Sequence, residues 1–218
     1  MGWLAANWSW VVSLLWDHLL LALPAIALSI VIAVPIGRFA YRHPRLGGPL
    51  LEASTLLYAI PALPLLIIIP VLIGSSLRSA TTMVVALTVY GVALLVRSAT
   101  DAFASVNSGV RDAAIAIGYS PRGVLWKVDL PLSIPVLLAG IRVVTVSTIS
   151  LVTIGALIGV SNLGTLLTDG FQRGITAEVA TGILTTMALA LVLDTLLLLL
   201  GRILTPWTAR SRAGGSAT

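Results

Sequence analysis

Residue types that carry out chemistry are scarce in this chain of 218 residues. It has no cysteine, which excludes disulfides, thiolate metal sites and cysteine nucleophiles. Its two histidines, His18 and His43, are too isolated to indicate a metal site, and no serine, histidine and carboxylate set suggests hydrolysis. No Gly-x-x-x-x-Gly-Lys-Ser/Thr loop is present, so the chain does not bind ATP through that motif. We therefore predict no catalytic residue, no metal site and no cofactor within this chain.

The most informative residues form a spaced set between positions 107 and 135. An Asp-Ala-Ala triplet is followed after three residues by Gly, after nine more by Val, and after one more by Leu-Pro. The members of the set are Asp112, Ala113, Ala114, Gly118, Val128, Leu130 and Pro131. The segment is polar enough to lie in the cytoplasm, yet its pattern is that of a folded loop. These residues are therefore the leading candidates for a functional role.

Start and stop signals in this segment predict two short helices joined by a tight turn. Ser108 can cap the first helix, with Asp112 in its first turn, where a negative charge suits the helix dipole. Gly118 is a natural stop because glycine readily adopts the left-handed conformation after a helix. Ser120 and Pro121 then restart a helix in the preferred order of cap and proline. The Leu-Pro pair at the end of the set is expected to close the second helix.

The composition predicts that lipid covers much of the protein. Hydrophobic residues make up 58% of the chain, charged residues only 10%, and the mean hydropathy is +1.05. So few charges cannot coat a water-exposed surface. A membrane span needs about 20 mostly apolar residues, and the fold class we predict is all-α, with about five transmembrane helices. The five stretches that qualify are residues 18–37, 49–73, 80–96, 134–158 and 177–200.

The distribution of basic residues orients these spans. Of the thirteen Lys and Arg residues, only Arg78 and Arg173 lie in the loops after spans two and four. The others lie in or beside the loops after spans one, three and five. By the positive-inside rule the N-terminus is outside and the C-terminus is cytoplasmic, as in a multi-pass protein of the cell's inner membrane. The net charge of +5 is explained in this way, without a nucleic-acid partner.

We divide the chain into three parts. Residues 1–16 are rich in tryptophan, which favours the membrane–water boundary, and are predicted to form an extracytoplasmic interfacial segment; we expect His18 at the same boundary. Residues 17–204 form the transmembrane domain, which includes the loop of about 99–133 between spans three and four. Residues 205–218 contain glycine and serine and are predicted to be a flexible cytoplasmic tail.

The span of residues 49–73 is a candidate for lining a substrate path. It carries Pro61, Pro64 and Pro70, and proline inside a helix removes a hydrogen bond and kinks the chain. One interpretation is a broken helix beside a path, and the other is a kinked helix that only helps packing. With Tyr58, which precedes the first two prolines, Pro61 and Pro64 are the candidate path residues of this span.

Asp194 completes the set of candidate path residues because it is the most deeply placed carboxylate. An acid within a span is a functional candidate by default. Its place near the cytoplasmic end, about two turns from Arg202, is an alternative explanation. Arg142, at the base of span four, is expected to contact lipid headgroups or the loop of residues 99–133.

The spaced set resembles the signature loop of ABC importer permeases. That family carries Glu-Ala-Ala, three residues, Gly, nine residues, Ile, one residue and Leu-Pro, and here Asp replaces Glu and Val128 replaces Ile. The resemblance implies that the loop couples transport to a separate ATPase by docking into a groove on it. Ala113 and Ala114 would then supply a smooth face, Gly118 the turn, and Asp112 a carboxylate for a polar contact. ATP would be bound by the partner subunit.

A narrower resemblance points to the permeases for osmoprotectants such as glycine betaine, carnitine and choline. It rests on Tyr-Ala-Ile-Pro-Ala-Leu at 58–63, on the run from Leu130 to Arg142, and on the glycine-bearing turn at 158–164. Small residues are usual in that turn, and Val160, Ser161 and Asn162 depart from the pattern. Permeases for methionine or other amino acids share much of it, so an amino acid or another small solute is an alternative substrate.

The resemblance also implies partners. Five helices are few to enclose a path, and the family pairs two permeases, identical or similar, around it. An extracytoplasmic solute-binding protein would select the substrate. Small residues along span four, such as Gly140, Ser147, Ser150 and Gly155, could serve that pairing or packing within one subunit. The remaining alternative is a stand-alone secondary transporter or membrane scaffold, for which we would expect internal repeats or clustered intramembrane charges.

Overall fold

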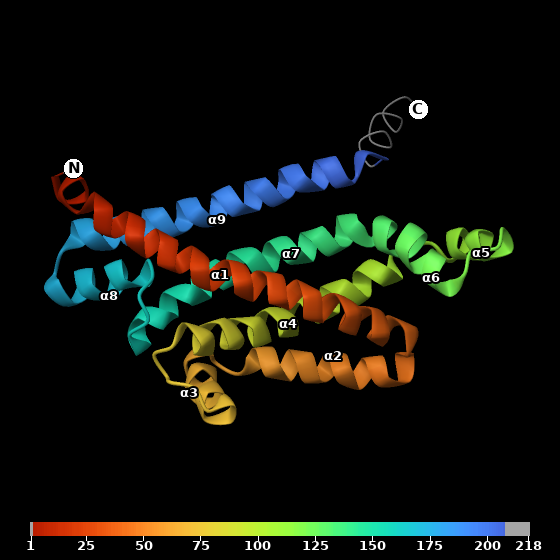
Figure 1. Cartoon of the computed structure of the whole chain (residues 1–218), viewed down its shortest axis with the longest axis horizontal. Coiled ribbons are helices and arrows are strands. Elements are labelled where there is room, and N and C mark those ends of the chain that lie inside the picture. Colours follow the sequence, from red (N-terminus) through yellow and green to blue (C-terminus); the bar gives the residue numbers. More distant parts are fainter. Residues whose placement is uncertain (1, 208–218) are drawn as a thin grey trace.

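The computed structural model describes residues 2–207, which are helical without a β-strand. Four long helices run lengthwise, and shorter helices lie at the two ends and along one side (Figure 1). The long helices are α1 (Gly2–Arg42), α4 (Ala80–Ala104), α7 (Leu130–Val152) and α9 (Thr176–Leu204). The shorter helices are α2 (Pro44–Ala59), α3 (Ala62–Ile73), α5 (Ser108–Ala116), α6 (Pro121–Val124) and α8 (Gly164–Arg173). A π-helical turn, Leu125–Asp129, precedes α7, and a 3-10 turn, Thr153–Ile158, follows it.

Four helical stretches of the described chain are long and apolar enough to cross a membrane. They are α1, α4, α9 and the continuous stretch Pro121–Ile158, and the bent pair of α2 and α3 makes a fifth if it is counted as one span. The all-α fold with about five spans is therefore confirmed. The short helix α8 was not predicted. Its Asp169 carboxylate accepts a hydrogen bond from Arg173 at 2.9 Å, which raises the pKa of that guanidinium above its usual value.

Helix α1 is longer than the first predicted span. It runs from Gly2 and departs from helical geometry at Asn7, whose side chain donates to the Trp3 carbonyl at 2.8 Å. The tryptophan-rich segment is thus part of the same helix as the span, and its place at the membrane boundary stays a prediction. The side chain of His18 is fully buried among the helices, and its place at the membrane boundary also stays a prediction.

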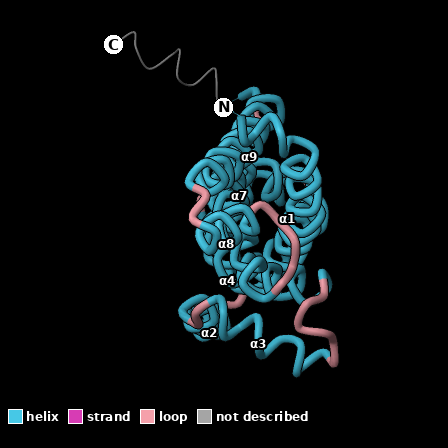
Figure 2. Tube along the Cα trace, turned by 90° about the vertical axis from the view of Figure 1, so that its left-hand side faces the viewer, coloured by secondary structure: helices cyan, strands magenta, loops and turns pink. Residues whose placement is uncertain are grey.

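The second predicted span is two helices. Helices α2 and α3 are bent by 107° relative to each other at Ile60 and Pro61. Ile60 is extended (ψ 126°), as the residue before a proline prefers, and Pro61 is extended as well (ψ 146°). Pro64 lies in the first turn of α3, where no intrahelical N–H bond is lost. The interpretation of residues 49–73 as a single kinked helix is therefore wrong. Seen along the bundle, α2 and α3 lie together on one side (Figure 2).

The centre of the bundle depends on small residues where helices cross. A Cβ atom on Gly37 of α1 would lie 2.5 Å from the Ala99 Cβ and 2.9 Å from the Thr100 nitrogen of α4. Gly140 of α7 lies against Ser98, and Gly155 lies against Asn162 and Met83. These two glycines of span four therefore pack within the subunit.

The two ends of the bundle differ in what they carry. The segment of residues 105–129 between α4 and α7, which we call the α4–α7 connection, lies at one end (Figure 1). The corner between α1 and α2 and the C-terminal end of α9 lie at the same end. Helix α8 and the start of α1 lie at the other. The predicted tail falls largely on residues 208–218, which lie outside the described part of the chain.

The close contact between α1 and α4 predicts unequal effects of the same substitution at two glycines. Gly37→Ala places a Cβ against backbone and should lower the free energy of unfolding by about 2 kcal/mol, as overpacking does. Gly48→Ala is the matched control, because a Cβ there meets nothing within 4 Å. It should be neutral or stabilising by up to about 1 kcal/mol, since alanine is the better helix former. Thermal unfolding in mild detergent compares the two, and equal melting temperatures would contradict the packing.

Candidate functional site

Helix α5 begins one residue earlier than predicted. Asn107, not Ser108, is its cap, and the Asn107 side-chain oxygen accepts a hydrogen bond from the Gly109 N–H at 2.8 Å. Ser108 is the first residue of the helix, so Asp112 lies beyond the first turn, which corrects our expectation for that carboxylate. Asparagine and serine are about equally good caps, so local preference did not distinguish the two neighbours.

The turn after α5 is formed as predicted. Gly118 has a φ of +93°, a left-handed conformation that residues with a Cβ adopt at a cost. The Gly118 N–H donates to the Ile115 carbonyl at 2.9 Å, and the Tyr119 N–H donates to the Ala114 carbonyl at 3.1 Å, which satisfies carbonyls at the helix end. Ser120 then caps α6 by accepting from the Gly123 N–H at 3.2 Å. The first short helix, the turn and the start of the second helix are therefore confirmed.

The second short helix does not close at the Leu-Pro pair. Helix α6 continues through the π turn into α7, so Leu130 and Pro131 open the long helix instead of ending the short one. The Leu130 N–H bonds to the Leu125 carbonyl, five residues back. Such a bond between residues five apart defines a π turn, which is a local widening of an α-helix. Proline at position 131 has no N–H to donate, and the π turn just before it replaces the ordinary hydrogen bonds between residues four apart at this point.

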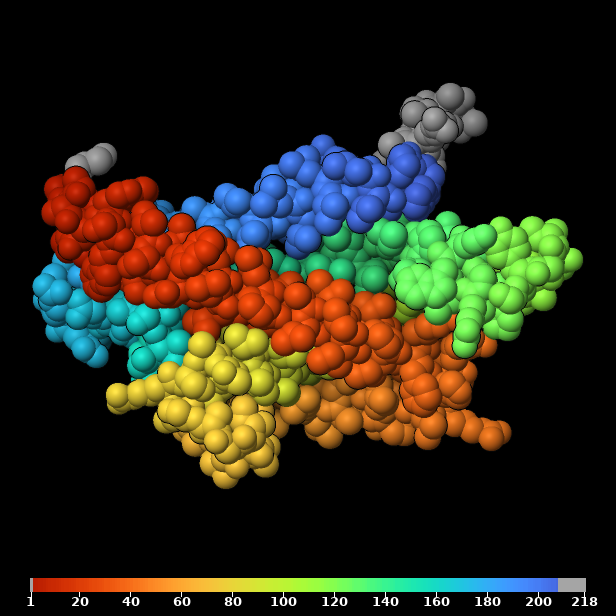
Figure 3. Space-filling view, viewed as in Figure 1, coloured from red at the N-terminus to blue at the C-terminus, as the bar shows by residue number. Residues whose placement is uncertain are grey.

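Some residues of the spaced set are buried within the α4–α7 connection, and others are exposed on its surface. Ala114, Val124 and Val128 form a small buried cluster that holds the two arms of the α4–α7 connection together. Asp112, Ala113 and Gly118 are exposed. The connection projects beyond the end of the bundle as a knob (Figure 3). It carries exposed apolar side chains that water does not favour: Ile115, Ile117 and Trp126, which are 59%, 76% and 66% exposed.

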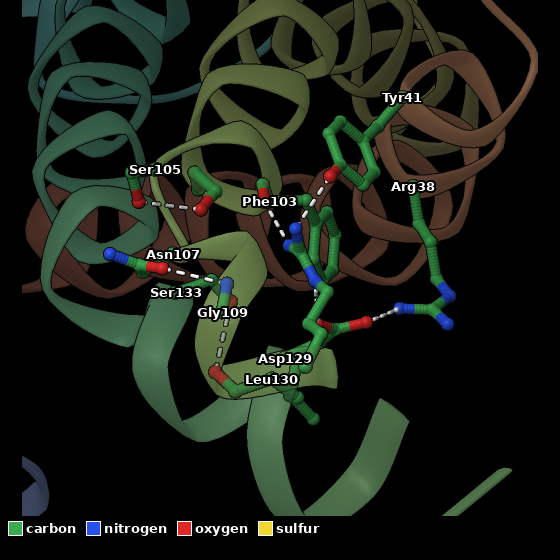
Figure 4. Close-up of polar contacts among 11 residues, drawn as sticks. Arg38, Tyr41, Phe103, Ser105, Asn107, Gly109, Asp129, Leu130 and Ser133 are labelled. Carbon is green, nitrogen blue, oxygen red and sulfur yellow. Dashed lines mark hydrogen bonds and ion pairs between the residues drawn. The ribbon is translucent and has the colours of Figure 1, made fainter. Parts of the chain in front are cut away.

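A buried carboxylate fastens this knob to the bundle. Asp129, whose side chain is 7% exposed, accepts from Arg38 of α1 at 3.0 Å and from Arg111 of α5 at 2.5 Å (Figure 4). Arg111 also donates to the Tyr41 hydroxyl and to the Phe103 carbonyl, both at 2.6 Å. The network therefore joins α1, the end of α4, α5 and the π turn.

Asp129 was not singled out from the sequence. It lies between Val128 and Leu130 of the spaced set, and a lone charge between apolar residues is a weak signal of a buried partner. Arg38 and Arg111 had been counted only as charges of the cytoplasmic side. A cavity of about 620 Å³ opens beside the network, between the corner of α1 and α2 and the α4–α7 connection.

The break between α2 and α3 forms a second cavity, of about 440 Å³. Tyr58 and Pro61 line it together with Tyr90 of α4 and with Ser147 and Ser150 of α7. The Tyr58 and Tyr90 rings meet edge to face with their centroids 5.9 Å apart. The Tyr90 hydroxyl donates to the Ile60 carbonyl, which fastens α4 to the break. Pro64, the other proline of the predicted path, is not among the residues that line this cavity.

Asp194 is paired, and its partner corrects our expectation for Arg142. Within the described residues Arg142 does not contact the α4–α7 connection: it holds Asp194 by two hydrogen bonds of 2.7 Å each. The pair lines a cavity of about 500 Å³ that shares Val146 and Ser147 with the cavity at the break. Three of the four predicted path residues thus lie on one stretch of surface along α7.

These features define a class of protein before any comparison. A bundle of apolar helices long enough to span a membrane, with a cavity between them and a folded knob at one end, has the architecture of a membrane transport subunit. The chain belongs to the family of binding-protein-dependent transport system inner membrane components, whose model matches residues 25–210. It is therefore a transport subunit of an ABC importer and not itself an enzyme.

Relatives agree with this membership. The osmoprotectant import permease protein OsmW of Salmonella typhimurium (strain LT2) is 36% identical over 203 residues, with 92% of this chain and 94% of that protein covered. The carnitine transport permease protein OpuCD of Listeria monocytogenes serotype 1/2a is 27% identical, with 92% and 89% covered. The fold matches that of the MetNI methionine ABC transporter in an inward-facing conformation, with a TM-score of 0.74, 23% identity, and 90% and 95% of the two chains covered.

Removing the Asp129 carboxylate should loosen the α4–α7 connection. Asp129→Ala leaves Arg38 and Arg111 without their buried partner and should cost about 3 kcal/mol, as breaking a buried ion pair does. Amide hydrogen exchange should rise in residues 105–129 while α9 stays protected. Asp112→Ala is the control, because the Asp112 carboxylate is exposed and forms no ion pair within residues 2–207. Unchanged exchange in Asp129→Ala would show that the network does not hold the knob.

Proposed function

We propose that this chain is the permease subunit of an ATP-driven importer for quaternary ammonium osmoprotectants, such as glycine betaine, carnitine or choline. The observation that carries the proposal is the similarity over nearly the whole chain to permeases named for osmoprotectants and carnitine. The cavity beside Tyr58 and Tyr90 supports the substrate class, because aromatic faces attract quaternary ammonium ions. ATP is bound by a separate subunit and not by this chain.

We propose further that the ATPase docks on the projecting knob of the α4–α7 connection. Asp112, Ala113 and Gly118 are exposed there, beside apolar side chains that water does not favour. Such a mixed patch of apolar and charged side chains is suited to a protein partner. In this arrangement Ala114, Val128, Leu130 and Pro131 keep the knob in shape, and Asp129 passes its motion to α1 and α4.

The remaining partners follow from the same proposal. A second copy of the chain, or a similar permease, completes the path, and an extracytoplasmic solute-binding protein delivers the substrate. The end of the bundle with the α4–α7 connection faces the cytoplasm, and the end with α8 faces the binding protein. The uneven distribution of basic residues supports this orientation.

The transport proposal is tested by uptake. The tagged full chain is isolated from its native membranes in mild detergent with the subunits it retains, and the complex is reconstituted with its binding protein. ATP-dependent accumulation of labelled glycine betaine, carnitine or choline is expected. Labelled methionine serves as the competing substrate. If only methionine is taken up, the proposed substrate class is wrong. If the chain repeatedly purifies without an ATPase, a stand-alone transporter is favoured instead.

The turn at Gly118 supplies a sharper test of docking. Gly118→Val forces a β-branched residue into the left-handed region, at a cost of about 2 kcal/mol, and should distort the knob. The retained ATPase and the uptake should both fall severalfold, while membrane insertion is unchanged. Gly118→Asn is the matched variant, because asparagine tolerates the left-handed conformation, and it should retain both. Normal uptake by Gly118→Val would count against docking at this turn.

A further inference from the structure

The cavity at the break between α2 and α3 has walls that would favour a cation. None of the residues that line it is basic: they are Tyr58, Ala59, Ile60, Pro61, Ala62, Tyr90, Val146, Ser147, Ser150 and Leu151. Its volume of about 440 Å³ falls in the range of small-molecule sites. The adjoining cavity, which shares Val146 and Ser147, contains one basic residue, Arg142, and its charge is matched by Asp194 through two hydrogen bonds of 2.7 Å.

The break brings two helix ends to the cavity. Helix α2 ends at Ala59, and the last carbonyls of a helix have no intrahelical donor. Helix α3 begins at Ala62, and the residues Ala59 to Ala62 all line the cavity. The negative end of the α2 dipole and the positive end of the α3 dipole therefore offset each other there, and the attraction for a cation comes from the aromatic and hydroxyl groups.

The aromatic rings provide the second element of the site. Tyr58 is 45% exposed, and its ring meets Tyr90 at an interplanar angle of 80°, so the edge contact does not cover both of its faces. Tyr90 is held by its hydrogen bond to the Ile60 carbonyl. The hydroxyl groups of Ser147 and Ser150 complete the opposite wall on α7. Open aromatic faces bind cations without strong desolvation of the ligand.

We propose that this cavity is a transient binding site for a quaternary ammonium group, with the Tyr58 ring as its principal contact. The inference rests on the proposed function, since it assigns a place within the membrane to the substrate class named there. The same chemistry is offered by a trimethylammonium headgroup of a lipid. A weak site of this kind releases its ligand readily, as a path between two sides of a membrane requires.

The absence of cysteine makes a direct test possible. Ser150→Cys places one thiol in the full chain at the exposed wall of the cavity. The protein is embedded in bilayers that lack choline lipids, so that no headgroup competes. The rate of thiol modification by uncharged methyl methanethiosulfonate is then measured against tetramethylammonium chloride, with sodium chloride and tert-butanol as ionic and neutral controls. Tetramethylammonium alone should slow the reaction in a saturable way.

Substitutions at Tyr58 assign the effect to the ring. Tyr58→Phe keeps the aromatic face and should keep the protection, whereas Tyr58→Leu should require roughly tenfold more tetramethylammonium for the same protection. Ser13→Cys, on the exposed face of α1 and away from the cavity, should show no protection. Lack of protection at Ser150→Cys with native Tyr58 overturns the site, even if the leucine variant fails to fold. Equal protection in Tyr58→Leu and Tyr58→Phe overturns the role of the ring.

The two proposals fail in different ways. If the intact importer accumulates a quaternary ammonium compound but tetramethylammonium does not protect the thiol, the site is wrong and the function stands. If no quaternary ammonium compound is accumulated by the complete complex, the function is wrong, whatever the labelling shows.

Discussion

The carboxylate of Asp129 joins parts of the chain that are far apart in sequence. Arg38 is 91 residues away from it and Arg111 is 18 residues away, yet Arg38 donates to one of its oxygens and Arg111 donates to the other. Two arginines and one carboxylate give this cluster a net positive charge. The Tyr41 hydroxyl and the Phe103 carbonyl accept hydrogen bonds from Arg111, and the guanidinium of Arg38 lies over the Phe103 ring. These contacts help to stabilise the positive charge. Without this junction the knob would depend on a cluster of three apolar side chains and the helix that follows it. The ion pairs of Asp129 therefore help to fix the position of the α4–α7 connection relative to α1.

A second constraint comes from the hydrocarbon, in which backbone groups must find partners within the protein. The bend of 107° between α2 and α3 frees carbonyls at the end of α2. The structure meets this demand with a hydroxyl group, because Tyr90 of the neighbouring helix donates to Ile60. The same broken backbone thus explains why α4 carries a tyrosine at this depth and why a cavity with polar walls exists inside an apolar bundle.

Features governed by neighbours in sequence could be predicted, and features governed by distant partners could not. The turn at Gly118 and the cap at Ser120 follow from local preferences, and the structure has both. The spans follow from hydropathy, apart from their ends. Asp129, by contrast, is one acid among several until α1 is packed beside it. Arg142 and Asp194 are 52 residues apart, and nothing in either local segment indicates the other. The Leu-Pro pair at residues 130 and 131 was predicted to end a helix, but α7 begins there, directly after the π turn. Leu-Pro is compatible with both the end and the start of a helix, so the pair alone could not distinguish the two.

The π turn has a mechanical consequence. It lets the helix that begins in the knob continue without interruption, so Pro121–Ile158 is one rod of 38 residues, roughly 55 Å long at 1.5 Å per residue. One end of this stretch lies in the α4–α7 connection, and its far half carries Ser147 and Ser150. The knob and one wall of the cavity at the break are therefore parts of a single continuous run of helix, joined through the backbone itself as well as through side-chain contacts.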